Sequence, residues 1–104
     1  MKIVLVVIDY AAMIGPFKHK GLREFFETNR KRGIPPELSA RLRDRLDVID
    51  AATALEDIAL PHFDLHELKG DRAGTWAVKV NKNWRLTFTF AGGEADDVNF
   101  EDYH

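Results

Sequence analysis

Three short clusters in the 104-residue sequence carry side chains that can transfer protons or bind a negatively charged group. His66 and Lys69 lie in the run HELKGDR, Arg85 lies in NWR, and the chain ends in Asp102-Tyr103-His104. Cleavage of RNA by attack of its 2′-hydroxyl needs a base, an acid and cations that offset the charge of the phosphorane. The clusters contain all three kinds of group, so RNA cleavage is one chemistry that they predict.

Each of these residues also has an interpretation without chemistry. Lys69 is also typical of a turn, and Arg85 is typical of an exposed strand. His66 is typical of a surface histidine, and the last three residues are typical of a frayed chain end. Only the combination favours a site. The sequence has no cysteine and no H-E-x-x-H motif, so we expect neither a metal ion nor a cofactor.

The composition predicts one globular domain and weakly disfavours binding to nucleic acid. Hydrophobic residues make up 45% of the chain, and the formal net charge is −2. The charges are nevertheless segregated along the chain. Nine Lys or Arg residues stand against four acids between Lys18 and Arg45, whereas six acids and no Lys or Arg fall between Asp47 and Glu67. These blocks are either solvated surface or the source of a basic face.

The first twelve residues form a segment of their own. Its apolar run, Ile3 to Ile8, is too short for a membrane span and short for a signal peptide. We therefore predict a possible extension or extra strand at residues 1–12, a domain at 13–104, and no membrane association.

Helical periodicity covers the first half of that domain. A helix is predicted from Lys20 to Arg32, with an apolar stripe and a stop at Gly33. Pro35-Pro36 is expected to open a second helix, because proline is tolerated in a first turn. A short extra turn is predicted from the Thr53–Glu56 spacing. The apolar stripe of the first predicted helix consists of Leu22, Phe25 and Phe26. That of the second consists of Leu38, Leu42, Leu46 and Ile49. The other faces of the second helix carry Arg41, Arg43 and Arg45.

The period changes to two in the second half. Trp76–Val80 and Trp84–Phe90 alternate as a hairpin around Asn81-Lys82-Asn83, Gly92-Gly93 makes the next turn, and Asp97–Tyr103 forms a last strand. We expect the helices to cover Trp84, Leu86, Phe88 and Phe90, and expect Arg85, Thr87 and Thr89 to face outward. The predicted fold is α+β, with an N-terminal helical hairpin packed on a twisted antiparallel sheet.

From Met13 to His104 the sequence resembles the HigB toxins of type II toxin–antitoxin systems, in the RelE/ParE superfamily. The stretches that carry the resemblance are MIGPFKHKGLREFFE, LSARLRDRLDVIDAAT, LHELKGDRAGTWAVKVNKNWRLTFTF and NFEDYH. It implies a RelE-like fold and a cytoplasmic, ribosome-dependent, metal-independent nuclease that cuts mRNA in the ribosomal A site. It also implies neutralisation by a helix-turn-helix antitoxin of the HigA type.

The resemblance extends to single positions. Lys69 matches the lysine of the family's LKG motif, and His66 the histidine three residues before it. Arg85 matches the arginine of NWR, and Asp102, Tyr103 and His104 match the terminal DYH. It implies that Lys69 and Arg85 bind the scissile phosphate, that His104 or His66 moves protons, that Asp102 orients a partner, and that Tyr103 packs on or hydrogen-bonds the nucleotide.

Two other functions stay open. A ParE-like toxin with the same fold would poison DNA gyrase by binding, and a non-catalytic remnant would only bind an antitoxin or operator. The proton-transfer groups favour the nuclease, since a gyrase binder has no need of them.

Overall fold

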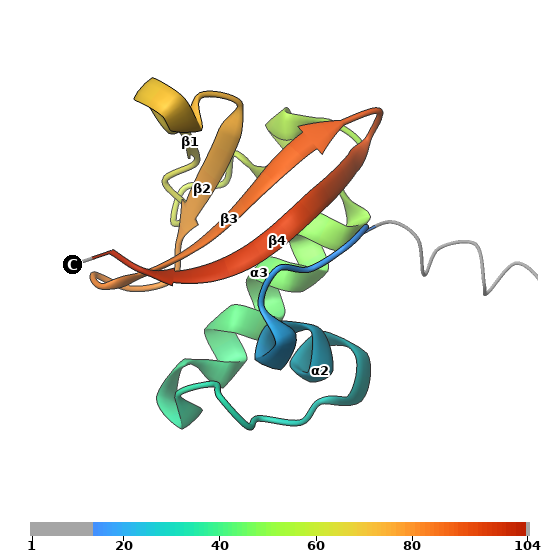
Figure 1. Ribbon diagram of the computed structural model, residues 1–104, viewed down its shortest axis with the longest axis vertical. Coiled ribbons are helices and arrows are strands. Elements are labelled where there is room, and N and C mark those ends of the chain that lie inside the picture. The colour runs from blue at the N-terminus through green and yellow to red at the C-terminus, as the bar shows by residue number, and fades with distance from the viewer. Residues whose placement is uncertain (1–13, 104) are drawn as a thin grey trace, which may run out of the picture.

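The computed structural model describes residues 14–103, and it confirms the predicted α+β fold. Two helices pack on a four-stranded antiparallel sheet of order β1-β2-β3-β4 (Figure 1). Residues 1–12, predicted as an extension or extra strand, lie outside the described residues, as does His104. The elements are α2 (Lys20–Thr28), η1 (Pro36–Leu38), α3 (Ser39–Ala51), η2 (Leu55–Ile58), β1 (His66–Glu67), η3 (Gly70–Arg72), β2 (Thr75–Lys79), β3 (Trp84–Ala91) and β4 (Glu94–Asp102).

The first helix is shorter than predicted. α2 ends at Thr28, where Asn29 takes the left-handed conformation with φ 62° and donates its backbone N–H to the Phe25 carbonyl. Asparagine tolerates this conformation and can end a helix in place of glycine. The expected stop at Gly33, and the placement of Arg30 to Arg32 in the last helical turn, are therefore wrong.

The second helix is confirmed, but its basic face is not wholly exposed. Pro36 begins η1, which leads directly into α3, and Leu38, Leu42, Leu46 and Ile49 are all buried. Arg45, which was predicted to lie on an exposed face, is only 8% exposed. Its Nε donates to the Lys79 carbonyl at 2.8 Å, so it links α3 to the end of β2.

The predicted extra turn after α3 is present as η2. The carboxylate that holds it belongs to Asp57 and not to Glu56. It accepts from the backbone N–H groups of Thr53 at 3.0 Å and Ala54 at 3.2 Å, and these hydrogen bonds lower the pKa of Asp57.

The predicted hairpin and last strand are confirmed, and β4 begins earlier than expected, at Glu94. A bulge interrupts the β3–β4 register between Thr87 and Thr89, near Asp97, whose φ is 52°. Leu86 and Phe88 are buried in the core as predicted, whereas Trp84 and Phe90 are half-buried against it. Thr87, expected to face solvent, is 1% exposed, because side chains from neighbouring segments cover it.

The segment before α2 covers the outer edge of β4. Ile14 and Phe17 make parallel bridges to Ala95 and Val98, and Gly15 donates its N–H to the Ala95 carbonyl at 2.8 Å. A Cβ on Gly15 would lie 1.9 Å from a carboxylate oxygen of Asp96, so a larger residue here would require that side chain to move. The contact pairs backbone groups that an open edge would expose. Within residues 14–103, no helix is long and apolar enough to cross a membrane.

Candidate active site

The strand register gathers polar side chains on the sheet face opposite the buried Val78, Leu86 and Phe100. Residues that pair directly across antiparallel strands share a face. Two adjacent rows on this polar face are His66, Ala77, Thr87 and Asn99, and Lys79, Arg85 and Glu101. Two of the six predicted site residues, His66 and Arg85, therefore lie on one face although they come from β1 and β3.

Arg85 is held in place by the β2–β3 turn and lies against the end of the chain. Its Nη1 donates to the carbonyls of Asn81 at 2.7 Å and Trp84 at 3.1 Å. Its guanidinium carbon lies 4.7 Å from the centre of the Tyr103 ring. The Tyr103 N–H donates to the Asn83 carbonyl, so the turn also positions the terminus. The contact brings two of the predicted residues together.

The tautomer of His66 follows from its hydrogen bond. Its Nδ1 lies 2.9 Å from the Asp64 carbonyl, which can only accept. In the neutral ring, Nδ1 therefore carries the proton and Nε2 keeps its lone pair. Nε2 is therefore the ring nitrogen that is left to accept a proton or a hydrogen bond.

Lys69 and Asp102 lie at the margins of this arrangement. Lys69 is exposed and immediately precedes η3, the helical turn that connects β1 to β2. Asp102 pairs with Trp84, so its position in the strand puts it on the face of Trp84 and not on that of Arg85. The structure therefore brings Arg85 and Tyr103 together, and places Asp102 on the opposite side of β4.

A hydrogen-bonded group in the middle of the polar face was missed from the sequence. Arg72 of η3 forms two hydrogen bonds to Glu101 of β4, at 2.9 and 2.7 Å. Thr87 and Asn99 donate to the same carboxylate at 2.5 and 3.3 Å. Arg72 and Glu101 both belong to stretches that carry the family resemblance, LKGDR and NFEDYH, and that was the available signal.

This group lowers the pKa of Glu101 to about 2, and the hydrogen bonds from Arg72 are the largest cause. Glu101 is consequently an anion at neutral pH and serves as an acceptor rather than as a proton donor. Because Lys69 immediately precedes η3, the bond from Arg72 to Glu101 also ties that lysine's segment to the strand that leads to Tyr103.

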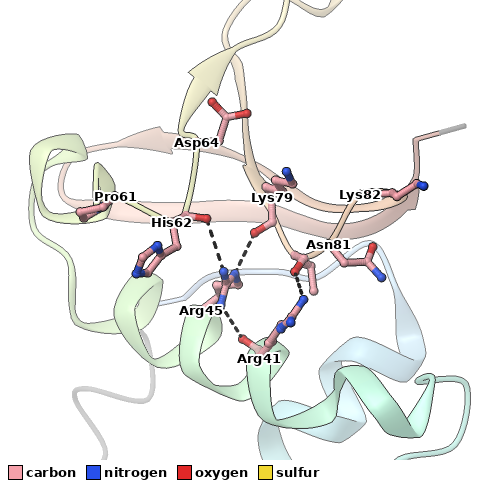
Figure 2. A pocket seen from close by; sticks show the side chains of 9 residues that line it. Arg41, Arg45, Pro61, His62, Asp64, Lys79, Asn81 and Lys82 are labelled. Atoms are coloured by element: carbon pink, nitrogen blue, oxygen red, sulfur yellow. Dashed lines mark hydrogen bonds between the residues drawn. The ribbon is translucent and has the colours of Figure 1, made fainter.

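Two surface hollows adjoin these residues. A pocket of about 220 Å³ lies on the polar face beside Arg72, Thr87 and Glu101. A larger pocket of about 770 Å³ lies between α3 and the end of β2, and its lining includes Asn81 but none of the six predicted site residues (Figure 2). The larger of the two pockets therefore does not include Arg85. The polar face is the candidate active site because of the chemistry of its side chains.

The spacing of His62 and His66, with three residues between them, is one that metal ligands can adopt on a helix. The two histidines instead lie in a turn and in a strand. Within the described part of the chain, no group of three or more His, Asp or Glu side chains is placed to hold a metal ion.

Residues 15–104 match the protein family described as "RelE-like toxin of type II toxin-antitoxin system HigB". "Endoribonuclease HigB" of Proteus vulgaris is 47% identical over 92 residues, which are 88% of this chain and 100% of that protein. "Toxin HigB-1" of Vibrio cholerae serotype O1 is 36% identical over 81 residues, which are 76% of this chain and 85% of that protein.

Solved structures resemble the chain in fold. The YoeB dimer from Staphylococcus aureus aligns with a TM-score of 0.58 and 15% identity, over 89% of this chain and 99% of that one. A YoeB/ParE toxin from Agrobacterium tumefaciens aligns with a TM-score of 0.53 and 14% identity, over 88% and 97%. At these identities the likeness concerns the fold.

Proposed function

The chain belongs to the HigB family of RelE-like toxins of type II toxin–antitoxin systems, and on that premise we propose that it is an endoribonuclease that cuts messenger RNA. The observation that carries the proposal is the contact between Arg85 and Tyr103. It sets a cation against the terminal cluster, on a sheet face that also holds His66.

The proposed reaction uses groups of this chain and of the RNA itself. His66 accepts the 2′-hydroxyl proton at Nε2, and the 2′-oxygen attacks the adjacent phosphorus. The bond from phosphorus to the 5′-oxygen breaks, and that oxygen takes a proton from His104, the remaining candidate acid. The products are a 2′,3′-cyclic phosphate and a 5′-hydroxyl.

Positive charge assists this step. Arg85 and Lys69 offset the charge that gathers on the phosphorane oxygens, and loss of one such donor typically slows catalysis about 10²–10³-fold. The Arg85 guanidinium is oriented in advance by the Asn81 and Trp84 carbonyls, which are neutral and leave its charge available to the phosphate. Tyr103 packs on or hydrogen-bonds the nucleotide, and Asp102 orients a partner group from the far side of β4.

Membership of the family implies an antitoxin partner, and the finer identity of the partners is part of the proposal. A toxin of a type II system has an antitoxin. We further propose that this antitoxin is a HigA-type helix-turn-helix protein, that the message is cut in the ribosomal A site, and that the toxin acts in the cytoplasm. We assign the activity to residues 13–104, leaving residues 1–12 as an extension.

Mapping of mRNA 5′ ends after induction tests the nuclease proposal. Wild type should give cuts phased with codons, and Arg85→Ala and His104→Ala should each lose them by about a hundredfold or more. Lys31→Ala, a change at an exposed cation outside the site, is the matched control and should cut like wild type. Growth arrest with intact transcripts and broken DNA would favour gyrase poisoning, and no arrest at all would favour a non-catalytic remnant.

A further inference from the structure

Four of the nine residues that line the pocket of about 770 Å³ between α3 and the end of β2 are Lys or Arg (Figure 2). Arg41 and Arg45 enter it from α3, and Lys79 and Lys82 from the end of β2 and the turn that follows. Asp64 is the one acidic residue in its lining. The pocket therefore carries an excess of positive charge in a chain whose formal net charge is −2.

Arg45 lines this pocket and is held mainly by backbone carbonyls. Besides the 2.8 Å bond to the Lys79 carbonyl, it reaches the carbonyls of Arg41 and His62 at 3.5 Å. It also forms an ion pair with Asp44 at 3.6 Å, and solvent screens this pair because the Asp44 side chain is 65% exposed. Carbonyl oxygens accept hydrogen bonds but bring no negative charge, so the field of this 8% exposed guanidinium extends into the pocket.

Arg41 is the second arginine of the pocket, and it too donates to a backbone carbonyl. Its Nη1 donates to the Val80 carbonyl at 3.4 Å, a long bond that leaves most of its hydrogen-bonding capacity unused. Two guanidiniums thus approach the end of β2 side by side (Figure 2).

The pocket adjoins the candidate active site at two residues, Asn81 and Lys79. Asn81 lines the pocket, and its carbonyl accepts the 2.7 Å bond from Arg85. Lys79 pairs with Arg85 across β2 and β3. An RNA strand whose scissile phosphate lies at Arg85 would therefore pass directly beside the pocket.

We propose that this pocket binds a phosphodiester group of RNA other than the one that is cut, with Arg41, Arg45 and Lys82 as its cationic contacts. The proposal rests on the proposed nuclease function. A phosphate fits better than a protein partner, because the lining has no Trp, Tyr or Phe, the aromatic anchors that protein interfaces use together with arginine. Among the lining residues Pro61 and Val80 are the apolar ones, and Val80 is already 2% exposed.

Salt-dependent binding of uncleavable RNA tests the subsite without relying on catalysis. The double variant Arg41→Gln/Lys82→Gln removes two exposed charges and leaves the buried Arg45 intact. Lys31→Gln removes an exposed charge elsewhere and is the matched control. Each protein is titrated against a 2′-O-methyl oligonucleotide alone, and against ribosomes programmed with a 2′-O-methyl message.

The double variant should lower the slope of log affinity against log salt by at most about 0.7, since one lost phosphate contact on a single strand contributes about 0.7. Affinity should fall by up to about fourfold at 0.15 M salt. A change with the oligonucleotide assigns the phosphate to the message, and a change with ribosomes alone assigns it to ribosomal RNA.

Slopes that match the Lys31→Gln control with both RNAs would overturn the subsite, as would weakened antitoxin binding with both RNA affinities unchanged. A wild type that binds RNA through the pocket but cuts none would contradict the nuclease proposal and keep the subsite. Unchanged slopes together with normal cutting would overturn the subsite and keep the nuclease proposal.

Discussion

The guanidinium of Arg85 is oriented by neutral groups, as its proposed contact with a phosphate requires. It donates hydrogen bonds to two backbone carbonyls, and an aromatic ring lies against its guanidinium. Its Nε is buried and has no hydrogen-bond partner among residues 14–103. A buried donor without a partner is costly, and such a cost is tolerated more often at functional sites than elsewhere. The geometry therefore sets Arg85 apart from Arg72, whose charge is paired with Glu101.

Glu101 makes the stability of the molecule depend on pH. Its pKa is about 2 in the folded chain against an ordinary value of 4.5, so the unfolded chain binds the proton more tightly. The resulting stability is present above about pH 4.5 and is lost as the pH falls towards 2. Arg72 has a side chain that is 45% exposed, and solvent screening therefore reduces the gain to roughly 1–2 kcal/mol.

Urea unfolding of wild type and Glu101→Gln over this pH range measures the effect. The variant should be less stable by roughly 1–2 kcal/mol at pH 7, and the gap should narrow between pH 4.5 and 2. Glu27→Gln, at an exposed position of α2, is the control and should show no such narrowing. A gap that stays constant down to pH 2 would mean that the carboxylate charge contributes nothing.

The sequence predicted the contacts of some single residues and not those of others. Arg85 and Tyr103 were expected to share a site, and they are in contact. The bond between Arg72 and Glu101 was not foreseen, because it joins residues 29 positions apart and depends on strand register. The burial of Arg45 was missed for a similar reason. Its acceptors lie on β2 and in the preceding loop, and helical spacing says nothing of them.

The turn between β2 and β3 is the element that positions the candidate site. The Asn81 side chain accepts from the N–H groups of Asn83 at 2.9 Å and Trp84 at 2.8 Å. Its backbone carbonyl holds Arg85, and the Asn83 carbonyl holds Tyr103. One three-residue turn therefore fixes both partners of the central contact.

Asn81→Ala should destabilise the chain by about 1–2 kcal/mol, because it removes the acceptor of two backbone donors. Asn81→Asp keeps an acceptor oxygen and should remain within about 0.5 kcal/mol of wild type. Free energies of unfolding in urea measure both. Equal stability of the two variants would show that the backbone bonds between Val80 and Trp84 hold the turn on their own.

Elements were predicted where periodicity is strong and misjudged at their ends. Alternation located the β2–β3 hairpin, and the leucine spacing located α3. The end of α2 was placed too late because a single residue, Asn29, adopts a left-handed conformation that glycine was expected to supply. β4 was predicted too short because a bulge near Asp97 interrupts its alternation.

At the scale of the whole molecule, net charge is a poor guide to what the surface binds. The formal net charge of the chain is −2. Four cations meanwhile gather around one pocket beside Arg85. Positive blocks that are separate in the sequence are brought together by the packing of α3 against the sheet, and this convergence favours an RNA partner.

The chemistry of the cut RNA end tests the central claim most directly. Purified chain is added to ribosomes that carry a defined message, and the upstream fragment is analysed by mass spectrometry. We predict a 2′,3′-cyclic phosphate at its end, and no cut when the nucleotide before the scissile phosphate is replaced by its 2′-deoxy form. A 3′-hydroxyl end, or cutting that persists at the deoxy position, would contradict attack by the 2′-hydroxyl at the site of Arg85.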